Sequence, residues 1–312
     1  MTLDRGACII SVDTEMAWGA AHRRGEPPGD YGGERDAILG VLSTLERHGI
    51  GATWAIVGHL FLDRCDRPPH PEVVRPAFAW LEGDWFDVDP CTTLAEAPDW
   101  YGRDMVEAVR ASAVPQEIGC HSFAHVTAGE PGCSREAFAS DLAACRAAAA
   151  EPLRSFVYPR NSVGHVDVLA EAGFTAFRGR PPAPFADRAA PVRAALRVAD
   201  RVRPLAGSAV RPARHPSGVW DVPQTFLLAP ASRREWLPVG LWSRRPIARL
   251  RQAARERSLF HLWFHPYNVT ADPRRALATL DRICAEAAGL RDAGRLDTLT
   301  MGELAAGLRG RS

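Results

Sequence analysis

The sequence predicts an α/β fold: a closed or nearly closed barrel of parallel strands with helices packed around it. Apolar runs of strand length alternate along the chain with segments whose apolar residues recur at helical spacing, which is typical of βα units. The number of such runs favours a closed or nearly closed barrel, and 312 residues are an ordinary length for one. We therefore predict a single domain that spans residues 1–312.

The expected strands are short apolar runs. The first, ACIISV, has the character of a buried strand that ends at Asp13, and ATWAIVG is a second run of the same kind. In chain order, strands are expected at residues 7–12, 52–58, 117–120, 155–158, 174–178, 219–223, 259–265 and 297–299.

The expected helices lie between these strands. The first has apolar residues at 38, 39, 42 and 45, and Gly49 follows as a stop signal. In chain order, helices are expected at residues 35–48, 101–112, 134–150, 166–172, 243–257, 276–290 and 302–308. Residues 63–103, rich in Pro, Asp and Trp, are expected to form a long excursion over one end of the fold, whereas residues 180–218 allow no assignment.

Charge and cysteine content exclude several classes of protein. The formal net charge is +1, from 38 basic and 37 acidic residues, and all the basic residues are arginines. This balance argues against a nucleic-acid binder, and the lack of lysine excludes Schiff-base and P-loop lysine chemistry. The seven cysteines form no C-x-x-C pair and are expected to be free thiols. With no recognisable signal peptide or membrane-length apolar run, we expect a soluble, cytoplasmic protein without stable membrane insertion.

Two carboxylates follow the first expected strand. Asp13 and Glu15 are two residues apart, so both should project to one face of the strand end while Thr14 faces away. Acids held this close repel each other unless a cation neutralises one and the other is tuned as a base. The pair therefore indicates a metal-assisted acid–base site, or else two acids that cap a helix or form salt bridges.

Two histidines follow the third expected strand. His121 and His125 are four residues apart, so both imidazoles could bind one metal ion if a helical turn begins there. Their position favours this interpretation, because α/β barrels carry their chemistry at the carboxyl ends of strands. Two imidazoles and one carboxylate would leave positions open for water and substrate, which is typical of a catalytic metal site.

Two further groups are expected at strand ends. In FHLWFHPYN, His261, Trp263 and His265 share one strand face. The strand ends just after His265, where an imidazole would suit proton transfer near neutral pH, while His261 lies deeper and is expected in the core. Arg160, in YPRN, would orient and ionise whichever carboxylate does not bind the metal, unless it is a surface residue.

In this order along the chain, the motifs resemble those of the polysaccharide deacetylase family, from residue 9 to about residue 304. The resemblance implies the family's NodB-homology fold, a distorted (β/α) barrel of about seven parallel strands. HSFAH is similar to the family's histidine motif, ATWAIVG to its A-T-F-F-V-x-G strand, FVYPR with EAGF to its arginine motif, and LWFH to its late histidine motif. The first motif differs: many members carry two adjacent aspartates, whereas this chain has Asp13-Thr14-Glu15. Some relatives have D-x-D or D-x-E spacing, so the difference indicates a subgroup.

The resemblance implies a metal-dependent hydrolase that removes an N-acetyl group from an amino sugar or glycan precursor and releases acetate. By motif order, Asp13 would be the base, and Glu15, His121 and His125 would bind one divalent metal ion, expected to be Zn²⁺. The displaced second acid leaves the reverse assignment of Asp13 and Glu15 open. His265 would protonate the leaving amine.

The resemblance also implies a small-molecule or glycan substrate, with Arg160 orienting the base. Residues expected to contact the substrate from loops over the strand ends are Trp18, Trp100, Tyr101 and Asn161. The alternative for the aromatic residues is that they anchor long loops. The arginine-rich segment 243–257 is expected to be a solvated helix or, alternatively, a phosphate- or membrane-facing one.

Two other functions fit the same motifs. The first is an allantoinase-like or other cyclic amide hydrolase, which the D-x-E spacing favours. The second is a non-catalytic barrel that binds a glycan or a partner, which should have lost a ligand, the base or the late histidine. Acetate release separates the first alternative from a deacetylase, and retention of all these groups argues against the second.

Overall fold

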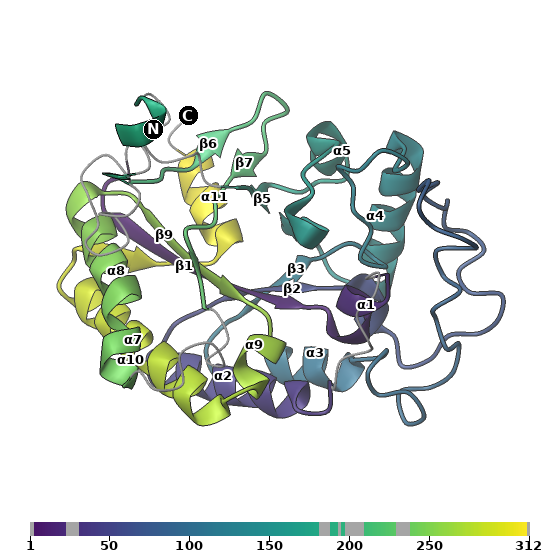
Figure 1. Cartoon of the computed structure of the whole chain (residues 1–312), viewed down its shortest axis with the longest axis horizontal. Helices are drawn as coiled ribbons and strands as arrows, with labels where there is room; N and C mark the ends of the chain where they lie inside the picture. The colour runs from purple at the N-terminus through teal and green to yellow at the C-terminus, as the bar shows by residue number, and fades with distance from the viewer. Residues whose placement is uncertain are drawn as a thin grey trace.

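The structure is a computed structural model that describes residues 3–22, 31–180, 188–192, 195–196, 209–228 and 238–310. One sheet of ten strands runs through these residues, with the order β6-β7-β5-β4-β3-β2-β1-β9-β8, and β10 also pairs with β1. Every pairing between these strands is parallel except that of β6 with β7. The sheet curls into a half-barrel with helices around it (Figure 1), which confirms the predicted distorted (β/α) barrel.

Every expected strand is present. The strands are β1 (Gly6–Thr14), β2 (Thr53–Ile56), β3 (Glu117–Cys120), β4 (Ser155–Val157), β5 (Ala176–Arg178), β6 (Ala213–Arg214), β7 (Trp220–Asp221), β8 (Phe226–Leu227), β9 (Leu259–Phe264) and β10 (Leu296–Thr298). The strands β6 and β8, of two residues each, were not expected, because so short a strand shows no periodic pattern of its own.

The expected helices are also present. The longer ones are α2 (Glu34–Arg47), α3 (Arg103–Arg110), α4 (Arg135–Ala149), α5 (Val166–Glu171), α8 (Arg244–Glu256), α10 (Pro273–Asp292) and α11 (Met301–Arg309). Short ones are α1 (Met16–Ala20), η1 (Gly58–Phe61), η2 (Pro159–Asn161), α7 (Val239–Trp242) and α9 (Tyr267–Thr270). Among the described residues, no helix combines the length and apolar character needed to span a bilayer.

Different core clusters cover the two faces of the sheet, as the side chains of β1 show. Ile10 and Val12 belong to the large core cluster that includes α2, α4 and α10, whereas Ile9 belongs to a smaller cluster with α11. The first turn of α11 lies against the amino-terminal ends of the strands, since the Met301 amide donates to Thr53 Oγ1 at 2.9 Å. This packing fills the amino-terminal end of the concave face and leaves its carboxyl-terminal end for polar side chains.

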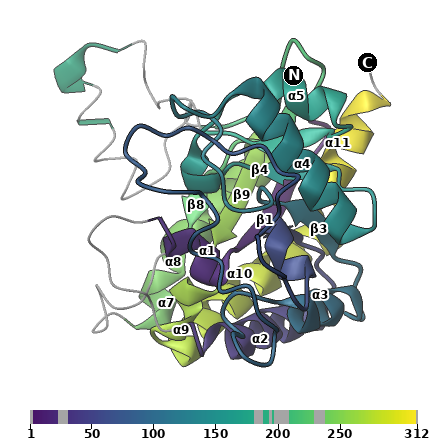
Figure 2. The same ribbon diagram turned by 90° about the vertical axis from the view of Figure 1, so that its right-hand side faces the viewer.

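The expected long excursion is present between η1 and α3. Residues 62–102 contain no named helix or strand and run along the side of the molecule that carries α1, α3 and α4 (Figure 2). Aromatic side chains fix the excursion to the core: Trp85 and Phe86 are 2% and 1% exposed. Of the unassigned residues 180–218, most lie outside the described part of the chain.

Candidate metal and catalytic site

Glu15, His121 and His125 meet at the carboxyl-terminal end of the strands. Glu15 Oε2 lies 2.8 Å from His125 Nε2 and 3.4 Å from His121 Nε2, and all three side chains are buried. One ligand atom from each lies within 4.8 Å of the others. The structure thus brings together the three residues expected to bind a metal.

The donor atoms are oriented as a metal site requires. His121 Nδ1 lies 2.8 Å from the Val157 carbonyl oxygen and can donate to it, so its Nε2 carries the lone pair that faces Glu15. Among the described residues, His125 Nε2 has no hydrogen-bond partner of acceptable geometry although it lies near Glu15, and burial lowers the pKa of His125, which favours the neutral imidazole. Two imidazole nitrogens and a carboxylate directed at one point fit a divalent cation such as Zn²⁺.

A loop, and not the expected helical turn, brings the two histidines together. Residues 121–126 have no helical assignment, and Ser122 and His125 have φ of 66° and 59°. Asp141 of α4 holds this loop: its carboxylate accepts from the Phe123 amide at 2.9 Å, the Ala124 amide at 3.3 Å and the Ser122 hydroxyl at 3.0 Å. The four-residue spacing of His121 and His125 thus does bring the two imidazoles together, but not through a helix. The buried Asp141 carboxylate accepts the hydrogen bonds that helix carbonyls would otherwise accept.

Asp13 is paired with an arginine, but the arginine is not the expected one. Arg178, the last residue of β5, makes two hydrogen bonds of 2.6 Å to Oδ1 and Oδ2 of Asp13, and both side chains are buried. Arg160 lies on η2 with φ of 52° and is exposed. The expectation that Arg160 pairs with the free carboxylate is thus wrong, because η2 directs the chain beyond the strand end whereas Arg178 still belongs to its strand.

A polar layer below Asp13 fixes Arg178. The guanidinium also donates to Ser11 Oγ at 3.0 Å and lies 4.5 Å above the Trp263 ring. His261 Nε2 lies 2.9 Å from Ser11 Oγ, and burial, with the charge of Arg178, lowers the pKa of His261 to about 3. His261 is therefore a neutral core histidine, as expected.

His265 faces both carboxylates, as expected. Its Nε2 lies 3.7 Å from Asp13 Oδ2 and 3.6 Å from Glu15 Oε1. Asn268 Oδ1 accepts from the His265 amide at 3.0 Å and lies 3.3 Å from Nδ1, while Tyr267 stacks on the ring at 4.4 Å. These contacts fix the imidazole so that Nε2 is the atom available to a reacting group.

Both carboxylates are ionised in this setting. Burial alone would raise the pKa of Asp13, but the charges of Arg178 and His265 outweigh it and lower the pKa. Burial would likewise raise the pKa of Glu15, yet the charge of His265 and the histidine contacts at the Glu15 carboxylate hold it well below its usual value. The site is therefore a pair of buried anions suited to a cation and to proton transfer.

The residues expected to contact substrate have varied environments. Trp18 and Tyr101 are 0% exposed, and Tyr101 donates to Asp89 Oδ1 while Trp18 donates to the Trp100 carbonyl oxygen. Trp18 lies on the helix α1, and not in the expected loop, whereas Tyr101 lies at the end of the excursion. Both rings are buried, which agrees with the alternative interpretation as anchors and leaves no ring face for a substrate. Trp100 is partly buried, and Asn161 is partly exposed with an Oδ1 that makes no hydrogen bond to the described residues.

Arg178, Asn268 and Asp141 were missed in the sequence. Arg178 had a usable signal, because it ends an apolar strand in the way that Asp13 and His265 do. Asp141 had none, since an acid on a helix is ordinarily a surface residue. Asn268 lies in the quoted segment FHLWFHPYN, but its contact with His265 depends on the turn that α9 makes.

No family model matches the sequence, and no curated protein matches it. Solved structures do resemble the fold. A protein of Mycobacterium smegmatis assigned to the polysaccharide deacetylases has a TM-score of 0.62 at 13% identity, over 99% of this chain and 92% of its own. A family 4 carbohydrate esterase from Streptomyces lividans has a TM-score of 0.39 at 14% identity, over 95% and 92%. A CE4 family pseudoenzyme from Bacillus anthracis has 0.41 at 13%, over 91% and 62%.

At such low identities the likeness concerns the fold. The Mycobacterium protein matches almost the whole of this chain, and the order of the strands places the sequence motifs around one site. We conclude that the chain has the fold of the polysaccharide deacetylases, the family that its motifs resemble.

Proposed function

We propose that this protein is a metal-dependent hydrolase that removes an N-acetyl group from an amino sugar or glycan precursor. The observation that carries the proposal is the convergence of Glu15, His121 and His125 on one point, with Asp13 and His265 beside it. Three ligands with open positions are typical of a catalytic metal site, and a base and an acid on either side suit hydrolysis of an amide.

The roles follow from these contacts. When bound by Glu15, His121 and His125, the metal, which we propose to be Zn²⁺, supplies Lewis acidity toward water and the acyl carbonyl. Asp13, held ionised by Arg178, accepts a proton from the attacking water at a carboxylate oxygen. His265 Nε2 donates a proton to the departing nitrogen, so water and amide become acetate and amine.

The test combines metal analysis with acetate release over a panel of N-acetyl sugars and nucleotide sugars. We expect bound metal and acetate release in the wild type. His121→Ala should lose the ion held by this site together with acetate release, and His265→Ala should keep the metal content of the wild type with roughly 10²–10⁴-fold lower turnover. His48→Ala, a half-buried histidine that contacts Asp281, serves as the control. A metal content in His121→Ala equal to that of the wild type would refute the ligand assignment.

Two other outcomes would redirect the proposal. The Asp13-Thr14-Glu15 spacing favours a cyclic amide hydrolase as the second candidate, which would open cyclic ureides or imides without releasing acetate. Glycan binding with no turnover on any amide, in a protein that carries its metal, would indicate a non-catalytic barrel.

A further inference from the structure

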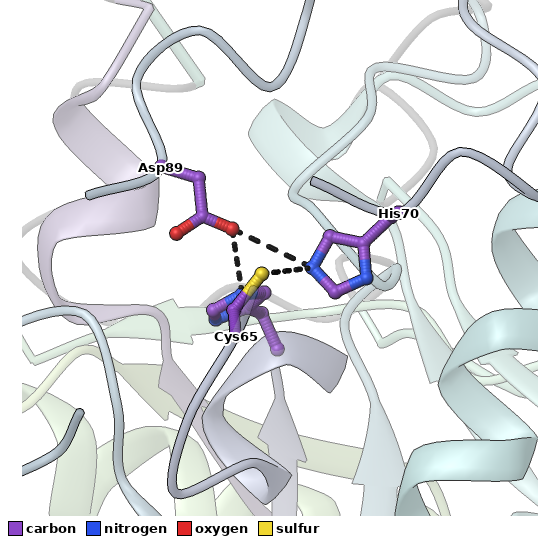
Figure 3. Close-up of side chains that lie close together, drawn as sticks. Cys65, His70 and Asp89 are labelled. Atoms are coloured by element: carbon purple, nitrogen blue, oxygen red, sulfur yellow. Dashed lines mark hydrogen bonds and ion pairs between the residues drawn. The ribbon is translucent and has the colours of Figure 1, made fainter. Parts of the chain in front are cut away.

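A second group of metal-binding side chains lies outside the proposed catalytic site. It consists of His59 on η1 and Cys65, His70 and Asp89 on the excursion 62–102. One ligand atom from each lies within 4.8 Å of all the others. Figure 3 shows the side chains of Cys65, His70 and Asp89 pointing toward one another from separate parts of the chain.

The atoms of this cluster converge on a common point. Asp89 Oδ2 lies 2.9 Å from His59 Nε2 and 3.5 Å from His70 Nε2, and Cys65 Sγ lies 3.4 Å from His70 Nε2. His59 and Asp89 are at most 1% exposed. Despite their short separation, His59 Nε2 and Asp89 Oδ2 do not make a hydrogen bond of acceptable geometry, so two buried polar atoms lack hydrogen-bond partners among the described residues.

In His59 and Asp89, the polar atoms that face away from the cluster are occupied, which orients their ligand atoms. His59 Nδ1 lies 3.2 Å from the Trp100 carbonyl oxygen and can donate to it, as metal-bound histidines commonly do through their second nitrogen. Asp89 Oδ1 accepts from the Cys91 amide at 2.9 Å and from the Tyr101 hydroxyl at 3.4 Å. His59 Nε2 and Asp89 Oδ2 are thus the atoms left to face the cluster. His121 has the same arrangement at the first site.

We propose that His59, Cys65, His70 and Asp89 form a second, structural Zn²⁺ site. Four ligands from nitrogen, sulfur and oxygen complete a tetrahedron and leave no position open, which is typical of structural zinc and differs from the three-ligand catalytic site. A thiolate and a carboxylate with two neutral imidazoles would neutralise the divalent charge of the ion inside the protein. This proposal does not depend on the reaction of the first site.

The position of the cluster shows what such an ion would hold. His59 lies just after β2, while the other three ligands span the excursion, so the ion would join a loop of irregular backbone to the sheet. The His59 ring also contacts Trp18 at 4.6 Å between centroids, and Trp18 contacts Trp100 at 5.2 Å. Since Trp18 follows Glu15 by three residues, the ion would support α1 and the wall beside the catalytic site.

Cobalt substitution tests the proposal because this cluster contains a cysteine ligand and the site of Glu15, His121 and His125 does not. We expect the Co²⁺-loaded protein to show the near-ultraviolet charge-transfer band of a cobalt thiolate, and the Zn²⁺ protein to contain about two ions per chain. Cys65→Ser should abolish the band and leave about one ion, whereas His121→Ala/His125→Ala should keep the band and also leave about one. The band is an absorption reading and needs no activity.

Matched variants keep the test decisive. Cys91→Ser is the control, because Cys91 Sγ lies 3.8 Å from Cys65 Sγ but is not part of the cluster; it should retain both the band and the second ion. Asp89→Asn should lower the affinity of the second site for its ion in a chain whose Cys65 thiol is intact. Loss of the band with Cys91→Ser instead of Cys65→Ser would overturn the ligand set.

Stability provides the second measurement. Because the ion would bind only the folded chain, removal of metal from His121→Ala/His125→Ala should lower its Tm, and readdition of Zn²⁺ should restore it. The same cycle in a chain that also carries Cys65→Ser should change the Tm much less. A wild type with about one ion, no thiolate band and a Tm indifferent to Zn²⁺ would show that the cluster is only a buried polar group.

Discussion

At the scale of single residues, the pairing of Asp13 with Arg178 decides how the proposed base behaves. Both side chains are buried, and the guanidinium binds both carboxylate oxygens. The fixed, planar arrangement of donors makes arginine hard to replace at such a site. Removal of one partner leaves the other as a buried, uncompensated charge, which typically costs about 3–5 kcal/mol.

We predict that Arg178→Met retains metal but lowers turnover by about 10²–10⁴-fold, because Asp13 loses the group that orients it. The free energy of unfolding, measured in urea, should fall by about 3–5 kcal/mol. Arg178→Met/Asp13→Asn should recover much of that stability without recovering turnover, since no charge is left unpaired. Arg160→Met is the control, and a loss in that variant as large as in Arg178→Met would assign the role to Arg160.

At the scale of elements, α4 shapes the loop that carries the histidine ligands. Asp141 is 1% exposed and accepts three hydrogen bonds from residues 122–124, between His121 and His125. Burial raises the pKa of Asp141 to about 6, although the hydrogen bonds oppose this change. A helix in the core thereby supports a backbone in which Ser122 and His125 have positive φ.

We predict that Asp141→Asn lowers metal affinity by about 10–100-fold, the usual effect of removing a group that orients metal ligands. An amide can accept at one oxygen only, so at least one of the loop's donors loses its partner. The measurement is competition with a chelator for bound Zn²⁺. Glu136→Gln makes the same acid-to-amide change on an exposed position of α4 and should leave affinity unchanged. Equal Zn²⁺ affinities in the wild type, Asp141→Asn and Glu136→Gln would contradict the role of Asp141.

At the scale of the whole molecule, Glu34 makes the stability of the fold depend on pH. It is the first residue of α2 and 0% exposed, and neither carboxylate oxygen has a hydrogen-bond partner among the described residues. Burial, with the charges of Glu15 and Asp99, raises its pKa from 4.5 to about 8. The folded state therefore retains this proton over a range of pH in which the unfolded chain has lost it.

We predict that Glu34→Gln becomes more stable relative to the wild type as pH rises. The contribution of Glu34 to the free energy of unfolding is fully present below pH 4.5 and is lost as pH rises through about 8. The reason is that the Glu34 carboxyl ionises easily only in the unfolded chain. Between these limits the variant should gain a few kcal/mol relative to the wild type, measured by urea unfolding at each pH. Asp36→Asn, on an exposed position of the same helix, should show no such trend; a parallel pH dependence for Glu34→Gln and wild type would contradict the prediction.

The sequence by itself determined the strands, the longer helices and the residues that end them. Period-two and helical spacings report which face of an element is buried, so Asp13, Glu15, His121 and His265 could be placed at strand ends without coordinates. These local patterns also predicted a barrel of parallel strands with surrounding helices, and the structure has this architecture as a half-barrel. Local signals suffice here because the spacing of apolar residues within a short segment indicates which of its faces is buried.

Only the tertiary structure decided the contacts between distant segments. The pairing of Asp13 with Arg178 spans 165 residues and depends on the curl of the sheet. Likewise, His59 and Asp89 meet only because the excursion folds back onto η1. No periodic pattern in residues 62–102 predicts that the excursion takes this course. Spacing along the chain predicts neighbours within an element, whereas partners across the molecule are set by how elements pack, which is why the second cluster could not be foreseen.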